Sequence, residues 1–504
     1  MTISRIFEVT TWMEIHIALE GRHDLSGQIY RQLRAGILEG RLAGGTRLPS
    51  TRDLATQLGV SRKTTLDVFE RLLSEGYLNA RAGSGTFVAD GLERLPVQRS
   101  SHALAAVSAR ERAKAKQKTA ARAQPLWEQM PETFSLPMPT VASPHDFVGG
   151  ATDKSLFPFD VWRRCVNHAL RVQARSPGSY REVAGEQELR LAISRYLAFN
   201  RAVTSNWDDV IVTQGAQHAL DLIARITLRP GEIAALEDPG YPPVQACFTA
   251  AGARVVPVPV DSEGLIVRKL PDKARVVYVT PSHQFPLGMP MSLERRIELL
   301  EWAQERGAVI IEDDYDCEYR FEGRAMEPLK SLDRAGLVAY VGTFSKTIFP
   351  ELRVGYVVPP ASLYGPLLKA RQIADCHGCA LTQIALARFM LNGDFAKHLR
   401  RMHKTYAARR AMLLEHLRGD LAPWFEPIVP SAGIHMTARL KAPLSEERLV
   451  SAAREASIGV YGLAAFHLRV KPQPSVLFGY GNIAVEHIDA ALGKLAGLLP
   501  RLAR

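Results

Sequence analysis

The stretch of sequence that decides the fold is Gly342-Thr343-Phe344-Ser345-Lys346-Thr347-Ile348-Phe349-Pro350-Glu351-Leu352-Arg353. A lysine amine condenses with an aldehyde only when a fraction of it is unprotonated. Thr343, Ser345 and Arg353 are residue types suited to a phosphate close to Lys346. The stretch therefore predicts a cofactor site, although a lone Ser-Lys pair also occurs where a surface lysine follows a strand.

A cluster of acids upstream favours the cofactor site. Glu312-Asp313-Asp314-Tyr315-Asp316 comes directly after the apolar run Ala308-Val309-Ile310-Ile311. An acid at the carboxyl end of a buried parallel strand is well placed to pair with a pyridinium nitrogen, which strengthens the electron-sink character of such a ring. Asp313 is the candidate for this partner.

Composition limits the class of protein. A chain of 504 residues is too long for one core and predicts two or more domains, and 46% hydrophobic residues exclude a wholly disordered chain. The sequence shows no apolar run near 18 residues and no signal segment, so a soluble, cytoplasmic protein without membrane contact is expected. Five cysteines fit a reducing compartment. Cys376-His377-Gly378-Cys379 has a redox or metal spacing but lacks a second ligand pair, so no metal is expected.

The net charge of +11 is unevenly spread along the chain. Residues 1–123 hold 19 Lys+Arg against 12 Asp+Glu, a net +7, and the much longer remainder holds +4. This excess indicates a polyanion partner near the N-terminus, because phosphate contacts supply most of the affinity for nucleic acids. The alternative is a solvated charged face.

Three short helices and a hairpin are predicted between Gln28 and Asp90. The first helix carries the apolar stripe Ile29, Leu33 and Ile37. The second helix starts at a Ser50 or Thr51 cap and stops at Gly59. The third helix runs from Arg62 to Ser74 behind a Ser61 cap, and its inward-facing residues are expected to be Leu66, Phe69 and Leu73. Two strands, 77–81 and 85–88, flank Ala82-Gly83-Ser84 as a wing. This is a helix-turn-helix arrangement, whose second helix offers its N-terminal end to the major groove.

Four motifs in order then resemble the winged helix of GntR-type transcription regulators. They are Leu48-Pro49-Ser50-x-Arg52, Leu58-Gly59-Val60-Ser61-Arg62, Glu75-Gly76-Tyr77 and Gly83-Ser84-Gly85-Thr86-Phe87-Val88. The resemblance implies a DNA-binding domain over residues 24–91 that contacts a double-stranded operator through Arg52, Ser61, Arg62, Lys63, Thr64, Ser84 and Gly85. Arginine is the side chain best able to take a guanine edge bidentately.

The flanking segments differ in kind. Residues 1–23 are an N-terminal extension, within which Met13 is an alternative start. Residues 92–145 form a basic, Ala- and Pro-rich linker, partly helical and then extended. Its basic run, residues 110–122, is either solvated or in contact with DNA.

Residues 146–504 alternate β-branched apolar runs with helical stretches. The runs are Val210-Ile211-Val212-Thr213, Val276-Val277-Tyr278-Val279, Val309-Ile310-Ile311 and Val354-Gly355-Tyr356-Val357-Val358. Buried runs separated by helices predict an α/β domain with a mainly parallel sheet. The length of this segment requires a second, smaller lobe, expected from about Arg400.

Five further motifs resemble a fold-type I, class I aminotransferase, a pyridoxal 5'-phosphate-dependent transferase fold. They are Leu156-Phe157-Pro158, Thr213-Gln214-Gly215-Ala216-Gln217-His218-Ala219-Leu220, Glu237-Asp238-Pro239-Gly240-Tyr241-Pro242, Thr280-Pro281-Ser282-His283-Gln284-Phe285-Pro286-x-Gly288, and the Lys346 stretch. Fusion of such a domain to a GntR-type head resembles the MocR/GabR subfamily of regulators. The resemblance implies a head-to-tail homodimer.

The resemblance also implies a role for each site residue. Lys346 is the Schiff-base lysine; Gly215, Ala216 and Gln217 hold the phosphate at a helix N-terminus, together with Ser345 and Arg353. Tyr241 stacks on the pyridine, Asp313 faces its nitrogen, and Tyr315 faces its phenolic oxygen. Tyr180 is expected to reach the phosphate of the neighbouring subunit.

Two positions depart from the aminotransferase pattern. Phe285 stands where these enzymes place an asparagine that donates to the phenolic oxygen, and Leu477 stands where they place the arginine that binds a substrate carboxylate. Arg469 is the nearby candidate for that carboxylate. The alternatives are an effector with no α-carboxylate, or a carboxylate bound elsewhere.

These features favour a transcription regulator over an enzyme. Its effector, an amine or amino acid, is expected to form an external aldimine that frees Lys346 and shifts the balance of domain arrangements. The alternative is an active aminotransferase with an appended regulatory DNA-binding domain. Slow half-reactions of transamination fit either hypothesis, because Lys346, Asp313 and Tyr315 are all present.

Overall fold

A computed structural model describes residues 17–21, 23–91, 123–130, 143–323, 326–441, 444–469 and 473–502. The chain divides into two compact units, Met1–Ala121 and Arg122–Arg504. Met13, the basic run 110–122 and most of the segment 92–145 lie outside the described residues. Within the described ranges, no helix is long and apolar enough to cross a membrane.

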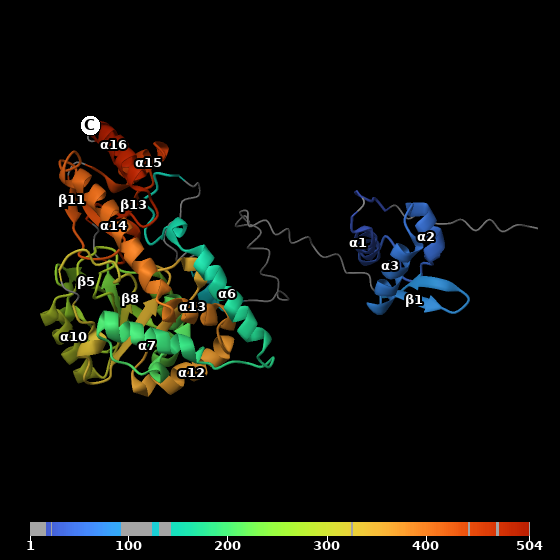
Figure 1. Ribbon diagram of the computed structural model, residues 1–504, viewed down its shortest axis with the longest axis horizontal. Helices are drawn as coiled ribbons and strands as arrows, with labels where there is room; N and C mark the ends of the chain where they lie inside the picture. Colours follow the sequence, from blue (N-terminus) through green and yellow to red (C-terminus); the bar gives the residue numbers. More distant parts are fainter. Residues whose placement is uncertain are drawn as a thin grey trace, which may run out of the picture. The chain divides into compact units, whose positions relative to one another are not determined.

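Three helices and a hairpin form the first unit, as predicted. Its elements are α1 (Leu25–Leu38), α2 (Thr51–Leu58), α3 (Arg62–Ser74), β1 (Leu78–Arg81) and β2 (Gly85–Val88), and the two strands pair antiparallel (Figure 1). The Ser50 and Ser61 hydroxyls accept hydrogen bonds from the N–H groups of Asp53 and Thr64. Gly59 closes α2 with a φ of 65°, a left-handed conformation that glycine adopts without strain. The caps and the stop are therefore confirmed.

The inward face of α3 differs from the predicted stripe. Leu66 is 43% exposed and Leu73 is only half-buried, whereas Thr65, Val68, Phe69 and Leu72 are buried. The Thr65 hydroxyl donates to the carbonyl oxygens of Thr51 (2.7 Å) and Arg62 (3.0 Å), which fastens α3 to the start of α2. A hydroxyl with satisfied hydrogen bonds can occupy a core position. Counting only apolar residues therefore identified Phe69 correctly but placed the other two inward positions, Leu66 and Leu73, one residue too late.

An eight-stranded sheet in the order β3-β10-β9-β8-β7-β4-β5-β6 forms the centre of the second unit. The strands are β3 (Ile211–Thr213), β4 (Ile233–Asp238), β5 (Arg254–Asp261), β6 (Gly264–Leu265), β7 (Ala274–Val279), β8 (Val309–Asp314), β9 (Val338–Thr343) and β10 (Gly355–Val358). Neighbours from β9 through β8, β7 and β4 to β5 pair in parallel. β10 is antiparallel to both β9 and β3, so the run 354–358 does not continue the parallel series. The sheet is mixed, and its parallel part brings the carboxyl ends of β4, β7, β8 and β9 to one edge.

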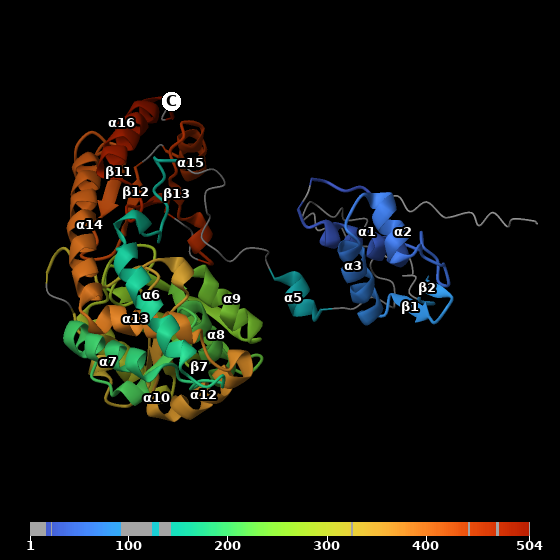
Figure 2. The same ribbon diagram turned by 45° about the vertical axis from the view of Figure 1, so that its right-hand side comes forward.

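Helices cover both faces of this sheet (Figure 2). One face packs against α8 (Ala216–Thr227), α9 (Pro242–Ala250) and α12 (Ala361–Asp375). The other packs against α6 (Phe159–Ala174), α7 (Gln187–Arg201), α10 (Leu293–Arg306), α11 (Leu329–Leu332) and α13 (Ala380–Leu391). Successive residues of a strand point to opposite faces, and accordingly Ile310 and Ile311 belong to different clusters.

A second, antiparallel sheet lies beyond the long helix α14 (Asp394–Arg418). Its order is β11-β12-β14-β13, from the strands β11 (Phe425–Ile428), β12 (His435–Leu440), β13 (Tyr461–Gly462) and β14 (Ser475–Gly479), and it shares a core with α15 (Glu446–Glu455) and α16 (Val485–Leu502). Phe395 on α14 belongs to the core of the large sheet, whereas Met402 and Leu413 belong to the core of the small one. One helix therefore takes part in both cores.

The remaining elements are short. They are α5 (Pro125–Gln129) and the 3-10 turns η1 (Lys154–Leu156), η2 (Trp207–Asp209), η3 (Val267–Lys269), η4 (Pro350–Leu352) and η5 (Ala464–Phe466). The turn η4 follows Lys346 and precedes Arg353, and it returns the chain from β9 to β10.

The packing of α3 yields a test in the full chain. Phe69→Ala removes a side chain that is 3% exposed and should cost roughly 3 kcal/mol or more, whereas Leu66→Ala should cost under about 1 kcal/mol. Hydrogen exchange of peptides from residues 62–74, followed by mass spectrometry, measures the loss of protection. Equal acceleration of exchange in the two variants would contradict this packing.

Candidate functional site

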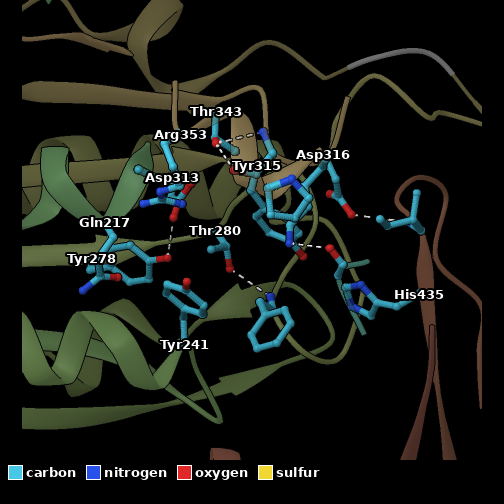
Figure 3. Close-up of a pocket in the computed structure, with 17 residues that line it drawn as sticks. Gln217, Tyr241, Tyr278, Thr280, Asp313, Tyr315, Asp316, Thr343, Arg353 and His435 are labelled. Atoms are coloured by element: carbon cyan, nitrogen blue, oxygen red, sulfur yellow. Dashed lines mark hydrogen bonds between the residues drawn. The ribbon is translucent and has the colours of Figure 1, made fainter. Parts of the chain in front are cut away.

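A cavity of about 240 Å³ lies in the second unit at the carboxyl edge of the parallel strands (Figure 3). It collects eight of the predicted cofactor residues, namely Ala216, Gln217, Tyr241, Asp313, Tyr315, Ser345, Lys346 and Arg353. The other lining residues are Gly150, Tyr278, Thr280, Phe285, Asp316, Thr343, Pro350, Ile434 and His435. Most of these groups come from β7, β8, β9 and β12, from the segments that follow β3 and β4, and from the η4 turn.

Lys346 follows β9 and is partly buried. Its Nζ donates a hydrogen bond to the carbonyl oxygen of Gly150 at 2.7 Å. Burial lowers the pKa of the Lys346 amine, although the carboxylates of Asp316 and Asp313 act in the opposite direction. A lowered pKa enlarges the unprotonated fraction that condensation with an aldehyde requires.

Asp313 lies on β8 with one carboxylate oxygen bonded and one free of partners. The Tyr278 hydroxyl donates to Oδ2 at 2.8 Å, while Oδ1 is buried without a hydrogen bond to the described residues. Burial raises the pKa of Asp313 to about 7, and the nearby Asp314 and Asp316 add to this effect. An orphaned buried carboxylate oxygen fits a ring N–H as its partner.

Gly215 and Arg353 lie together at the N-terminus of α8, and Arg353 lines the cavity. Gly215 caps the N-terminus of α8 with a φ of 85°, and a Cβ at this position would lie 3.0 Å from Arg353 Nη2. Arg353 donates to the Gln214 carbonyl oxygen at 2.9 Å, and the Thr343 hydroxyl donates to Ser345 Oγ at 3.0 Å. A helix N-terminus, a guanidinium and two hydroxyls are the groups that hold a phosphate.

Two aromatic side chains, Tyr241 and Tyr315, also line the cavity. Tyr241 caps α9 and contacts Phe285 edge to face at a centroid distance of 5.8 Å. The Tyr315 hydroxyl donates to the His283 carbonyl oxygen at 2.9 Å and lies 3.2 Å from His283 Nδ1. Both rings line the cavity, so a planar ligand bound in it would meet them.

The two departures from the aminotransferase pattern meet in one apolar cluster. Phe285, which lines the cavity, packs with Leu477 of β14, and the other members are Val148, Tyr461, Leu463 and Phe466. Arg469 does not line the cavity: the residue is exposed, and its backbone N–H donates to Asp238 Oδ2 at 2.9 Å. Among the described lining residues, Arg353 is the sole guanidinium.

Sequence reasoning missed three buried polar residues beside the cavity. His283, Asp316 and His435 are each 1–2% exposed and could bring one ligand atom each within 4.8 Å of one another. His283 and Asp316 lie inside motifs that had been singled out for other residues, whereas nothing in the sequence marks His435. Cys376 and Cys379 are exposed and belong to no such group in the described part of the chain.

The predicted DNA contacts occupy exposed positions of the first unit. Arg52 lies on α2, Arg62 and Lys63 begin α3, Ser84 lies in the turn between β1 and β2, and Gly85 begins β2. Thr64 is half-buried, and Ser61 uses its hydroxyl as the cap of α3. Sequence reasoning missed Arg47, whose guanidinium lies beside Gly85.

Tyr180 lies outside the cavity. Its side chain is 85% exposed, and its ring contacts the His377 ring edge to face at a centroid distance of 6.0 Å. The residue lies between α6 and α7. Its position leaves the ring free for a contact beyond this subunit.

Comparisons with known proteins match both units. The family model "Bacterial regulatory proteins, gntR family" matches residues 25–88, and "Aminotransferase class I and II" matches residues 151–482. The chain is 37% identical over 465 residues to the "Probable rhizopine catabolism regulatory protein MocR" of Rhizobium meliloti, covering 90% of each chain. It is 35% identical over 411 residues to the "HTH-type transcriptional regulator TauR" of Rhodobacter capsulatus, covering 80% of this chain and 82% of that one.

Two solved structures that are similar over most of the second unit are aminotransferases. Kynurenine aminotransferase of Pyrococcus horikoshii, crystallised with PMP, gives a TM-score of 0.67 at 26% identity, covering 72% of this chain and 92% of that chain. The α-aminoadipate aminotransferase LysN of Thermus thermophilus gives 0.64 at 27% identity, covering 71% and 92%.

Burial of Asp313 makes the stability of the cofactor-free protein depend on pH. A carboxyl whose pKa is raised from 3.8 to about 7 on folding contributes stability that is present below about pH 4 and is lost as pH rises through 7. Asp313→Asn should remove this loss, so the variant gains on the order of a few kcal/mol over the wild type at pH 8, at about 1.4 kcal/mol per pKa unit. Denaturant unfolding between pH 5 and pH 8 measures the difference.

A control variant isolates the effect of burial. Asp160→Asn removes an acid whose side chain is 82% exposed and should leave the pH slope unchanged. Identical slopes in the wild type and Asp313→Asn would show that Asp313 does not carry the effect.

Proposed function

Because the chain belongs to the MocR-type subfamily of GntR transcription regulators, we propose that it binds operator DNA and senses an amine or amino acid through pyridoxal phosphate at Lys346. We assign DNA binding to residues 24–91 and sensing to residues 146–504, joined by the linker 92–145 and preceded by the extension 1–23. The residues from about 400 onward serve as the small lobe of the sensing domain. As a partner of chromosomal DNA, the protein acts in the cytoplasm.

The observation that carries this proposal is the placement of three unlike groups around one cavity. An amine with a lowered pKa, a carboxylate oxygen without a partner and a guanidinium beside a helix N-terminus surround about 240 Å³. Pyridoxal phosphate, when bound, supplies an aldehyde that exchanges one amine for another, together with a ring that withdraws electrons. Lys346 would hold its aldehyde, Asp313 its ring nitrogen, and Arg353 its phosphate, with Ser345 and the N–H groups at Gly215, Ala216 and Gln217 completing the phosphate site.

The remaining residues would orient the ring. Tyr241 provides an aromatic face, and Tyr315 provides a hydroxyl for the phenolic oxygen. Burial raises the pKa of Tyr315 well above its ordinary value, so the hydroxyl keeps its proton at neutral pH. That proton is donated to the His283 carbonyl oxygen in this structure and would turn to the phenolic oxygen when the ring binds. An effector amine would release Lys346 from this arrangement, and the freed amine would return to a polar neighbour such as the Gly150 carbonyl oxygen.

The apolar wall at Phe285 favours sensing over turnover. Phe285 and Leu477 replace an asparagine donor and an arginine with one apolar cluster, and Arg469 is exposed to solvent. An effector without an α-carboxylate suits such a wall, because a carboxylate buried there would lack a partner. The presence of Lys346, Asp313 and Tyr315 supports an active aminotransferase as the second candidate, and steady-state formation of a keto acid from a panel of amino donors would favour it.

A homodimer would complete the site. The exposed Tyr180 is suited to reach the phosphate of the neighbouring subunit, and a head-to-tail arrangement would place each winged helix near the other subunit's sensing domain. An effector then acts only through its different affinity for two arrangements of these parts.

Replacement of Lys346 tests the sensing role. Lys346→Ala should abolish the visible absorption band of the holoprotein and the effect of amines on operator binding, because no other amine lines the described cavity. Binding to operator DNA in the absence of effector should persist. Lys369→Ala, on the exposed face of α12, is the matched control and should behave as the wild type. A wild-type visible spectrum in purified Lys346→Ala would refute the assignment.

Replacement of Lys63 tests the DNA surface. Lys63→Ala should weaken operator binding and lower the slope of log affinity against log salt concentration by about 1, since one phosphate contact is lost. Arg31→Ala, on α1 and paired with Asp24, should leave the slope unchanged. Fluorescence anisotropy across a salt series measures both.

Footprints at saturation should show two half-sites, and protection of a single one would argue against the dimer.

A further inference from the structure

Asp316 and His283 form a buried pair beside Lys346. His283 Nδ1 lies 2.8 Å from Asp316 Oδ1 and 3.0 Å from Oδ2, and each residue is at most 2% exposed. The backbone N–H of Ile434 also donates to Asp316 Oδ2 at 3.3 Å. Figure 3 shows the Asp316 carboxylate on the side of the view away from Arg353.

Two glycines make room for this pair. Gly433 has a φ of 93°, and a Cβ there would lie 2.7 Å from Asp316 Oδ2 and would overlap the His283 ring. Gly288 has a φ of 94°, and a Cβ there would lie 3.3 Å from His283 Nε2. The backbone at Gly433 and Gly288 therefore leaves space for the side chains of His283 and Asp316.

The hydrogen bonds determine how the charge is divided within the pair. His283 Nε2 is buried and has no partner among the described residues. A protonated imidazolium would leave a charged N–H unsatisfied at this atom, which costs more than leaving a neutral acceptor there. This arrangement favours Nδ1–H as the donor to Asp316, with the carboxylate as the anion of the pair.

We propose that the Asp316–His283 pair is a fixed buried anion that keeps the Lys346 nitrogen protonated in the holoprotein. Asp316 and Lys346 line the same cavity. Of the charges that oppose the effect of burial on the pKa of Lys346, Asp316 is the largest and Asp313 the second. The inference rests on the proposed function, in which Asp313 is directed to the ring nitrogen and Arg353 to the phosphate. Asp316 is then the charged lining residue that remains for Lys346.

The other titratable and charged groups around Lys346 do not take this role. Those that line the cavity are Tyr241, Tyr278, Asp313, Tyr315, Arg353 and His435, from β7, β8, β12, η4 and the start of α9. Burial raises the pKa of the three tyrosines, and burial together with His283 and Lys346 lowers the pKa of His435 well below its ordinary value. All four are therefore neutral near pH 7.

The pair also bears on the donor that Phe285 lacks. The His283 ring lies parallel to the Tyr315 ring, with an interplanar angle of 25° and a centroid distance of 5.7 Å, and the Tyr315 hydroxyl donates to the His283 carbonyl oxygen. His283 therefore positions Tyr315 while it holds Asp316. His283 thus places two polar groups, the Tyr315 hydroxyl and the Asp316 carboxylate, whereas the Phe285 side chain cannot form a hydrogen bond.

The test is a pH titration of the visible absorption of the holoprotein. A nearby anion favours a protonated cation, so Asp316→Asn should lower the pH midpoint of the spectral change by about one unit or more. His283→Leu, which removes the donor that holds the carboxylate, should lower the midpoint as well. His283→Asn keeps an N–H donor near the position of Nδ1 and should restore a midpoint close to that of the wild type. An unchanged midpoint in either Asp316→Asn or His283→Leu overturns the proposal.

Controls separate this result from other failures. Glu351→Gln removes one negative charge close in sequence to Lys346, but its side chain is 62% exposed, and the midpoint should stay in place. If Asp316→Asn does not retain pyridoxal phosphate, the cofactor-free protein can be tested by acylation of Lys346 with acetic anhydride at a series of pH values, measured by mass spectrometry. The pH midpoint of acylation should then be lower in Asp316→Asn than in the wild type. An unchanged midpoint overturns the proposal. A visible band that survives in Lys346→Ala refutes the proposed function itself, whereas a band that is lost there with no shift in Asp316→Asn refutes only the role of the pair.

Discussion

The free-energy cost of burying charged side chains at one edge of the large sheet constrains the rest of the structure. Lys346, Asp313 and Asp316 surround a small cavity where solvent cannot stabilise them, so each charged form requires a partner of opposite sign or a hydrogen bond. The parallel strands β7, β8 and β9 make this possible, because their carboxyl ends bring chain-distant residues to a common edge. The antiparallel strand β10 begins two residues after Arg353 and thereby returns the guanidinium to the same cavity.

Much of this arrangement is predictable where a local rule acts. The helix caps at Ser50 and Ser61 and the pairing of an acid with the end of β8 follow from short-range chemistry, and they were found from single motifs. The errors arose where tertiary contacts decide. Thr65 occupies a core position because its hydroxyl finds the Thr51 carbonyl oxygen across a turn, which no count of apolar residues detects. The reversal of β10 depends on the short η4 turn, and apolar content alone does not distinguish a parallel from an antiparallel strand.

The same distinction between local motifs and tertiary contacts holds for the candidate site. Lys346, Asp313, Arg353 and Gly215 stand in motifs and could be placed from the sequence. His435 belongs to the small lobe and approaches the cavity only through the packing of β12, so the sequence holds no local sign of it. Arg469 was favoured by its proximity in sequence to β14, yet its side chain is exposed while Leu477 turns inward. The apolar contact between Phe285 and Leu477 unites two departures that had seemed independent.

The helix α14 contacts both the backbone beside the cofactor cavity and the core of the small lobe. His398 on α14 lies 2.9 Å through Nε2 from the carbonyl oxygen of Thr347, the residue after Lys346, while the distal turns of the same helix are embedded in the core of the small lobe. Burial lowers the pKa of His398 to about 4, so this link keeps one protonation state across the physiological range. The backbone beside Lys346 and the core of the small lobe are thus tied to one continuous helix of 25 residues.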